Sequence, residues 1–173
     1  MEAKQIRELL KQKFGDAVTE VVHDGDGWVK VKRDGLLEIA QFIKEDSELV
    51  FDLLHCITAV DLEKGNLQCI YNLTSTSKKH WICLKVDVPA SEPSLPTLST
   101  LWKTADWHER EAYDMMGLLF TGHPNLKRIL CDEDWVGHPL RKDYVYPKEF
   151  RGVLCDVIQE EDEAIPLPRT LKK

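Results

Sequence analysis

The chain has 173 residues, which is enough for one domain with a hydrophobic core but too few for two substantial domains. Hydrophobic residues make up 43% of it and charged residues 31%, proportions that are ordinary for a soluble globular protein. The net charge of -7 and the lack of a basic stripe argue against a nucleic acid as the main partner.

The amino-terminal sequence is not typical of a targeting segment. MEAKQIRELLKQKFG contains basic residues but no apolar run, so we expect no signal peptide. Nowhere do about 18 apolar residues follow one another, so we expect no membrane span. The five cysteines form no C-x-x-C pair, which favours buried thiols over disulfides or an iron–sulfur ligand set.

The first elements expected are a helix and a hairpin. Apolar residues at helical spacing predict an amphipathic helix over residues 3–14, and Gly15 is a typical helix stop. Two β-prone runs follow at residues 17–23 and 28–33. The sequence Asp-Gly-Asp-Gly at residues 24–27 joins them and indicates a tight turn, because glycine readily adopts the positive φ that such turns need.

A second helix and three strands come next. Asp34 is the expected cap of this helix. Its predicted apolar face consists of Leu36, Ile39, Ala40 and Ile43. Strand-like runs occupy residues 49–61, 67–76 and 80–88, and their short connections suit only antiparallel neighbours. The chain is therefore predicted to be an α+β fold, with a mostly antiparallel mixed sheet (hairpin plus three-strand meander), packed helices and an extended C-terminal region.

The pattern changes after the meander. Residues 89–96 are expected to be a loop, and residues 97–103 a short helical turn. Asp106, with Glu109 three residues later, resembles a capping box and predicts the start of a third helix. Gly117 is its expected end.

The third helix carries the sequence WHEREAYDMMG, in which several charges share about three turns with large apolar residues. Glu109 falls within the apolar arc and needs a buried partner, unless the cap position turns it outward. Arg110 and Asp114 are spaced to pair with each other. Three interpretations are open: a charge network that joins this helix to two basic pairs, ordinary capping with solvated charges, and catalysis. The basic pairs are Lys127 with Arg128 and Arg141 with Lys142.

Two similar loops follow the helix. Residues 122–130 (GHPNLKRIL) and 137–145 (GHPLRKDYV) each place Gly-His-Pro just before a basic pair. Proline fixes its own φ and restricts the residue before it, so each loop should be a stiff turn that holds a histidine and aims two cations. We call them the first and second GHP loops, and rigid polar loops of this kind are typical of binding surfaces.

Metal and acid–base sites are weaker interpretations. His108, His123 and His138 are spaced fifteen residues apart, with Cys131 as a conceivable fourth ligand. Zinc ligands usually come in close pairs, so we expect no metal. An acid–base site from His123 and Glu109 is conceivable, but no nucleophile elbow, phosphate loop or paired-carboxylate motif accompanies it. We therefore expect no catalytic, cofactor-binding or metal-binding residues in this chain.

The last thirty residues lose periodicity. Residues 144–173 contain three prolines and the acidic run QEEDE, and they cannot by themselves bury enough apolar surface to offset their ordering entropy. The alternatives are a disordered terminus and an extended arm that becomes ordered on a partner, and we favour the arm. The predicted division is an α+β domain over residues 1–143 and a C-terminal arm over residues 144–173.

The region from 102 to 147 carries a family resemblance. WHEREAYDMMG, GHPNLKRIL and GHPLRKDY, in this order, resemble the signature of the thirty-kilodalton-subunit family of respiratory complex I. That family comprises the C subunit of bacterial NADH:quinone oxidoreductases and the J subunit of the cyanobacterial and chloroplast complexes. The signature region is residues 102–143, and weaker similarity extends over residues 57–75. Met116 stands where the family often has an aromatic residue, and Val145-Tyr146-Pro147 replaces a commoner Phe-Pro.

The resemblance implies a non-catalytic subunit of the peripheral arm, in the quinone module of a proton-translocating NADH:quinone oxidoreductase. Such a protein docks on the larger, D-like quinone-site subunit of a hetero-oligomeric complex. It reaches the cytoplasmic face of the inner membrane only through that complex and binds no cofactor itself. The whole complex would use NADH or another donor, FMN, iron–sulfur clusters and quinone. The equivalent subunit of a membrane-bound hydrogenase and a stand-alone metal or acid–base enzyme remain alternatives.

Eleven residues of this chain match the signature and are expected to serve the partner interface and the architecture rather than catalysis. They are Glu109, Arg110, Glu111, Asp114, His123, Lys127, Arg128, His138, Arg141, Lys142 and Asp143.

Overall fold

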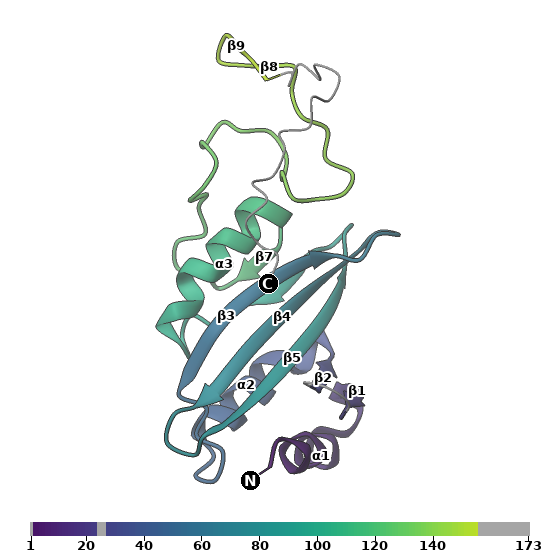
Figure 1. The fold of residues 1–173 in the computed structure, drawn as a ribbon, viewed down its shortest axis with the longest axis vertical. Coiled ribbons are helices and arrows are strands. Elements are labelled where there is room, and N and C mark those ends of the chain that lie inside the picture. The colour runs from purple at the N-terminus through teal and green to yellow at the C-terminus, as the bar shows by residue number, and fades with distance from the viewer. Residues whose placement is uncertain (1, 24–26, 156–173) are drawn as a thin grey trace, which may run out of the picture.

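Five strands form the central sheet of the computed structural model, which describes residues 2–23 and 27–155. The strands are β1 (Val18–Val22), β2 (Trp28–Val31), β3 (Leu53–Asp61), β4 (Asn66–Ser75) and β5 (His80–Pro89). Their order across the sheet is β1-β2-β5-β4-β3 (Figure 1). β2 and β5 run parallel, and every other neighbouring pair is antiparallel. The predicted α+β class with a mostly antiparallel mixed sheet is confirmed.

The first hairpin is confirmed by the antiparallel pairing of β1 with β2, in which Val22 lies opposite Trp28. Of the tight turn predicted between these strands, residues 24–26 lie outside the described residues.

The meander of β3, β4 and β5 follows the predicted strands closely. β4 and β5 pair without interruption from Asn66 opposite Pro89 to Ser75 opposite His80. β3 starts later than expected, at Leu53 rather than residue 49. Asp46 accepts hydrogen bonds from backbone N–H groups just downstream, and Val50 has a positive φ of 46°, so residues 49–52 are a loop instead of strand.

In the described part of the chain, three α-helices pack beside the sheet: α1 (Ala3–Phe14), α2 (Leu36–Glu45) and α3 (Lys103–Met116). α1 matches its predicted bounds, and Gly15 ends it with a φ of 46°. The four predicted apolar residues of α2 are completely buried. Asp34, however, does not cap α2. It lies in a short 3-10 turn (Arg33–Gly35), which places Gly35 at the cap position without a side-chain hydrogen bond.

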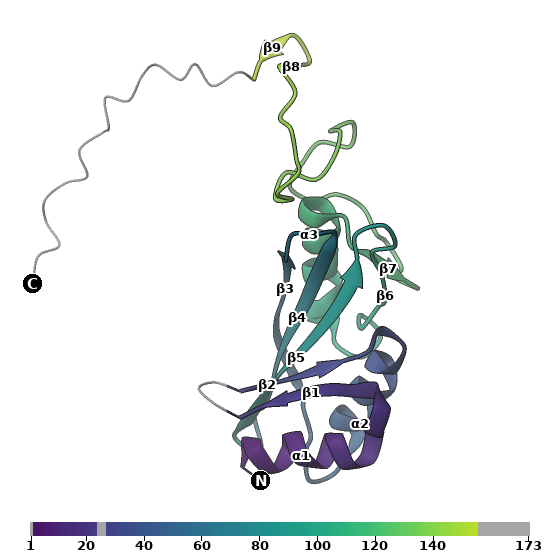
Figure 2. The same cartoon turned by 90° about the vertical axis from the view of Figure 1, so that its right-hand side faces the viewer.

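The hydrophobic core lies between the helices and one face of the sheet. Along β4, the buried side chains of Leu67, Cys69, Tyr71 and Leu73 alternate with half-buried ones, as the two-residue period of a strand requires. α2 and the later strands β6 and β7 lie on the same side of the sheet (Figure 2). The buried apolar residues of α1, α2 and α3 belong to one continuous cluster with those of the sheet.

A second, two-stranded sheet was not predicted. β6 (Ser94–Pro96) and β7 (Leu119–Thr121) pair in parallel, with Leu95 opposite Phe120. The predicted loop at residues 89–96 therefore contains a strand. Residues 97–102 form a turn in which the N–H groups of Leu101 and Trp102 both donate to the carbonyl of Leu98. This turn leads directly into α3.

Residues 122–148 contain turns and bends but no helix or strand. They lead to a small hairpin of β8 (Glu149–Phe150) and β9 (Val153–Leu154), which Arg151 ties back through an ion pair of 2.6 Å with Asp134. Of the predicted arm, residues 156–173 lie outside the described residues. None of the helices in the described part of the chain is long and apolar enough to cross a membrane.

Candidate functional site

The centre of the candidate site is α3, which packs against β3. Its cap lies four residues earlier than predicted: Trp102 occupies the cap position, and Asp106 lies inside the first turn of the helix. The predicted capping box of Asp106 and Glu109 is therefore wrong. Gly117 ends the helix in the left-handed conformation, as predicted, with a φ of 74°.

Glu109 is completely buried, as its place in the apolar arc indicates. Its partners are not the basic pairs. The hydroxyl group of Thr97 donates to one carboxylate oxygen at 2.5 Å, and the N–H of Leu98 donates to the other at 2.7 Å. Burial raises the pKa of Glu109 to about 7, although these two hydrogen bonds oppose the change. The side chain thus anchors the turn that follows β6 onto α3.

His123, from the first GHP loop, reaches the same side of α3. Its side chain is completely buried, and its Nε2 lies 3.2 Å from a carboxylate oxygen of Asp106 and 3.9 Å from one of Glu109. Its Nδ1 accepts the N–H of Asn125 at 3.0 Å. Nε2 also donates to the backbone carbonyl of Asp106 at 3.2 Å, so the loop holds one edge of the imidazole close to two carboxyl groups of α3.

Asp114 is the most heavily hydrogen-bonded carboxylate among the described residues, and it is completely buried. The successive N–H groups of Ile129, Leu130 and Cys131 all donate to Oδ2, at 2.9, 2.7 and 2.9 Å. Arg128 donates to Oδ1 at 2.7 Å. Burial alone would raise the pKa of Asp114, but the three backbone donors and Arg128 outweigh it and lower the pKa to about 2.

The predicted pairing of Arg110 with Asp114 is wrong, because Asp114 faces Arg128 instead. Arg110 lies over the ring of Trp107, 4.8 Å from its centroid, and its Nε donates to the carbonyl of Lys127 at 3.2 Å. Glu111 is exposed on the outer surface of α3. Asp114 therefore takes part in a charge network between α3 and the loops, as one interpretation of the sequence predicted. Glu109 does not belong to that network.

The second GHP loop holds the carboxyl end of α3. Nδ1 of His138 donates to the carbonyl of Asp114 at 3.0 Å, and Nε of Arg141 donates to the carbonyl of Met116 at 2.7 Å. These carbonyls have no partner within the helix, and cations are favoured at this end of the helix dipole. Burial, the largest cause, lowers the pKa of His138.

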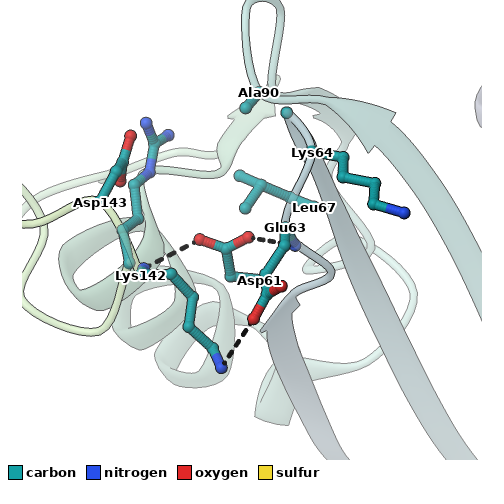
Figure 3. Close-up of a pocket in the computed structure, with 9 residues that line it drawn as sticks. Asp61, Glu63, Lys64, Leu67, Ala90, Lys142 and Asp143 are labelled. Atoms are coloured by element: carbon teal, nitrogen blue, oxygen red, sulfur yellow. Dashed lines mark hydrogen bonds and ion pairs between the residues drawn. The ribbon is translucent and has the colours of Figure 1, made fainter.

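The same loop also contacts the tip of the β3–β4 hairpin. The N–H of Lys142 donates to Asp61 at 3.0 Å, and its Nζ lies 3.3 Å from Glu63 (Figure 3). The hydrogen bond from Lys142 N–H is the first cause of a lowered pKa of Asp61. A shallow pocket lies here, and Asp143 completes its rim. The loop thus bridges α3 and the meander.

The outer surface of this region carries many apolar side chains. Seven large hydrophobic side chains between residues 130 and 154 are each at least 62% exposed, whereas the core residues are nearly inaccessible. We call them the apolar loop surface: Leu130, Val136, Leu140, Val145, Tyr146, Val153 and Leu154. Large apolar side chains left exposed in one region of a protein often belong to a contact with another protein.

Two kinds of residue escape prediction from the sequence. Thr97 and Leu98 hold Glu109, and nothing in their sequence context distinguishes them from ordinary loop residues. Asp61 is predicted only as part of a strand, although its position beside a Gly-containing turn fits an acceptor of backbone N–H groups. Among the described residues, no group of three or more histidine, cysteine or acidic side chains could hold a metal ion. The expectation that the chain binds no metal or cofactor stays a prediction.

Comparison with known proteins gives consistent matches. The family model described as "Respiratory-chain NADH dehydrogenase, 30 Kd subunit" matches residues 29–150. The C subunit of the NADH-quinone oxidoreductase of Chloroherpeton thalassium is 40% identical over 156 residues, which is 84% of this chain and 62% of that protein. The corresponding protein of Chlorobium phaeobacteroides is 39% identical over 158 residues, which is 84% of this chain and 90% of that protein.

Two solved structures share the fold. A trypsin-resistant fragment (1-134) of Nqo5 superimposes with a TM-score of 0.58 at 26% identity, covering 73% of this chain and 100% of the fragment. A chain of the membrane-bound sulfane sulfur reductase, an archaeal respiratory membrane complex, superimposes with a TM-score of 0.69 at 25% identity. That match covers 82% of this chain and 85% of the other.

Proposed function

Since the chain belongs to the family of the 30-kDa subunit of respiratory-chain NADH dehydrogenase, we propose that it is a structural subunit of an NADH:quinone oxidoreductase. Its place is the peripheral arm, in the quinone module, where it docks on the larger quinone-site subunit. NADH, FMN, iron–sulfur clusters and quinone serve the whole complex, and this chain contributes no catalytic residue. It lies at the cytoplasmic face of the inner membrane through its partners.

The apolar loop surface is the observation that carries this proposal. Its residues come mostly from segments without helix or strand, so their positions depend on the side chains that hold those segments to α3. A monomer gains nothing from large apolar side chains left exposed to solvent, whereas a protein interface buries them.

The signature residues divide into a support and an outer surface. Asp114, Arg128, His138 and Arg141 build the support, because they hold the two GHP loops to α3. Glu111 is exposed on the outer side of α3, where it is available for contact with a partner.

Assembly of the complex tests the proposal. Leu130→Asp and Leu140→Asp each place a charge on the apolar loop surface, at side chains that are 63% and 62% exposed, so the isolated chain should keep its thermal stability. A tagged chain with either substitution should recover much less of the other subunits than the parent chain does when it is purified from cells. The control is Leu37→Asp, which changes a residue of α2 that is 41% exposed and lies outside this surface. Normal recovery with both loop variants would contradict the proposal.

A second candidate rests on the likeness to the membrane-bound sulfane sulfur reductase. The chain would then be the equivalent subunit of a related membrane-bound complex that receives electrons from another donor. The interface argument is the same for both candidates, so the variants above do not separate them. Reduction of a quinone by the purified complex with NADH as the donor supports the first, and failure with NADH but activity with another donor supports the second.

A further inference from the structure

The carboxyl group of Glu109 is buried without a charged partner. Both of its hydrogen-bond donors, the hydroxyl of Thr97 and the N–H of Leu98, are neutral groups. Among the described residues, no lysine or arginine nitrogen lies within 4.0 Å of it, and the one basic side chain at that distance is His123. A buried carboxylate that no cation compensates is costly, and the usual response is to bind a proton.

The first GHP loop fixes the orientation of the His123 ring beside Glu109. Asn125 N–H donates to Nδ1, so this nitrogen carries a lone pair and the ring hydrogen is assigned to Nε2. The Nε2–H donates to the backbone carbonyl of Asp106 at 3.2 Å and lies 3.9 Å from Glu109, so the ring gives Glu109 no hydrogen bond.

The hydroxyl groups beside Glu109 can accommodate both protonation states. Oγ of Ser99 lies 2.8 Å from Oγ1 of Thr97, which lies 2.5 Å from the carboxyl group. When Glu109 is ionised, Ser99 donates to Thr97 and Thr97 donates to the carboxylate. When Glu109 is protonated, its own O–H donates to Thr97, which then donates to Ser99. Because Ser99 is half-buried, this chain of hydroxyls leads from the interior towards the surface.

The other titratable groups that face Glu109 do not favour its charge. Asp106 on α3 is acidic, and its proximity raises the pKa of Glu109 further. Cys69 and Tyr71 on β4 face it from the sheet, and burial raises the pKa of Cys69 to about 12 and that of Tyr71 well above its usual value. Both groups therefore stay protonated and neutral near pH 7.

We propose that Glu109, Thr97, Ser99 and His123 form a buried proton-binding site, and that loss of the proton weakens the attachment of residues 97–99 to α3. The site joins three segments that are distant in sequence: the turn after β6, α3 and the first GHP loop. Its ligand is a single proton, which passes between solvent and Glu109 along the hydroxyls of Ser99 and Thr97. The inference concerns the chain alone and does not depend on the proposed function.

The direction of the effect follows from the pKa of Glu109, which is raised from 4.5 to about 7. The folded state holds the proton more tightly than a state in which Glu109 is solvated. This stabilising contribution is complete below about pH 4.5 and is lost as the pH rises to about 7. Opening of residues 97–99 should therefore be easier at pH 8 than at pH 5.

Carboxyl ¹³C NMR of the full chain, labelled at glutamate, tests the proton-binding site. One resonance should titrate near pH 7, well apart from those of exposed glutamates, and it should be missing in Glu109→Gln. Thr97→Val keeps the side-chain shape but removes a donor to the ionised form, so the midpoint should move to higher pH. If that resonance titrates with the ordinary glutamates in the parent chain, the site is not a proton-binding site and the proposal fails.

Hydrogen exchange of the Leu98 amide tests the weakened attachment. After correction for the intrinsic rate, its protection in the parent chain should fall by about tenfold or more between pH 5 and pH 8, since one pKa unit corresponds to a factor of ten. Protection in Glu109→Gln should change little over this range. The amide of Leu84, in β5 at the centre of the sheet, is the internal control. Equal pH dependence in the parent and in Glu109→Gln, or no loss of protection in the parent, would overturn the coupling.

Discussion

At the scale of single residues, two acidic side chains of α3 are both completely buried, but burial is accompanied by opposite changes in their pKa values. Asp114 is ionised, because three backbone N–H groups and Arg128 compensate its charge. Glu109 has two neutral donors, and its pKa rises instead. The difference lies in the partner segments and not in the two residues themselves. Asp114 meets three successive amides of a loop, whereas Glu109 meets a turn with one hydroxyl and one amide.

Substitution of the two arginines should separate the buried network from the outer charges. Arg128→Ala leaves the buried carboxylate of Asp114 without its cation and should lower the free energy of unfolding by about 3–5 kcal/mol. Arg110→Ala removes a side chain that packs on Trp107 at the surface and should cost about 0–1 kcal/mol. Urea unfolding of the two full-length variants measures both values. Similar losses in the two variants would show that Asp114 is not held in the way described.

The sequence predicts part of this arrangement at the residue level. The helical spacing of Glu109 places it among apolar side chains, and the structure confirms its burial. Its partner could not be predicted, because Thr97 reaches it through a turn whose path depends on the pairing of β6 with β7. Spacing favours a partner for Asp114 within its own helix, since Arg110 is available there. The tertiary contact with Arg128 prevails because it brings three backbone donors with it.

At the scale of elements, local patterns are sufficient for α1, α2 and the meander. These elements have clear periodicity, and short turns connect the strands of the meander. β6 and β7 escape prediction because each has only three residues and pairs with a segment more than twenty residues away. The predicted start of α3 is wrong because aspartate is a preferred cap residue, which favoured Asp106. The actual cap is Trp102, which makes no side-chain hydrogen bond to the helix.

Gly117 shows how one backbone position couples α3 to the second GHP loop. Its φ is 74°, and an added Cβ would come within 2.6 Å of the His138 ring and 2.7 Å of Arg141. Gly117→Ala should therefore destabilise the chain by more than the roughly 1 kcal/mol that the left-handed conformation alone costs. Gly65→Ala is the matched control, because Gly65 has a φ of 79° with open space around it. Equal decreases in the melting temperatures of the two variants would show that the second GHP loop does not crowd Gly117.

At the scale of the whole molecule, one end is a conventional core of sheet and helices, and the other is a set of loops held by α3 (Figure 1). The division predicted from the sequence, with a domain over residues 1–143 and an arm over residues 144–173, stays a prediction. The described residues of the arm include the short hairpin of β8 and β9, whose Val153 and Leu154 are 66% and 77% exposed. Composition alone could not predict this hairpin, since Arg151 stabilises it through Asp132 and Asp134.

Hydrogen exchange should distinguish the isolated chain from the assembled complex at this hairpin. A pair of two-residue strands has few hydrogen bonds and little buried surface, so the amides of residues 148–155 should exchange rapidly in the isolated chain. In the complex they should be protected, because we expect the arm to become ordered on a partner. Amides of β4 serve as the reference that is protected in both states. Rapid exchange of residues 148–155 in both states would exclude this role.

The single parallel pairing in the sheet has a consequence for the order of folding. Short turns join β3, β4 and β5, so these strands can pair through local contacts. β2 pairs with β5, which lies more than fifty residues further along the chain. Closing so long a loop is entropically costly and slow compared with hairpin formation. During synthesis, the first hairpin emerges early but has no strand to join until β5 has left the ribosome. We expect the amino-terminal third of the chain to dock onto a meander that has already formed, and this docking to limit the rate of folding.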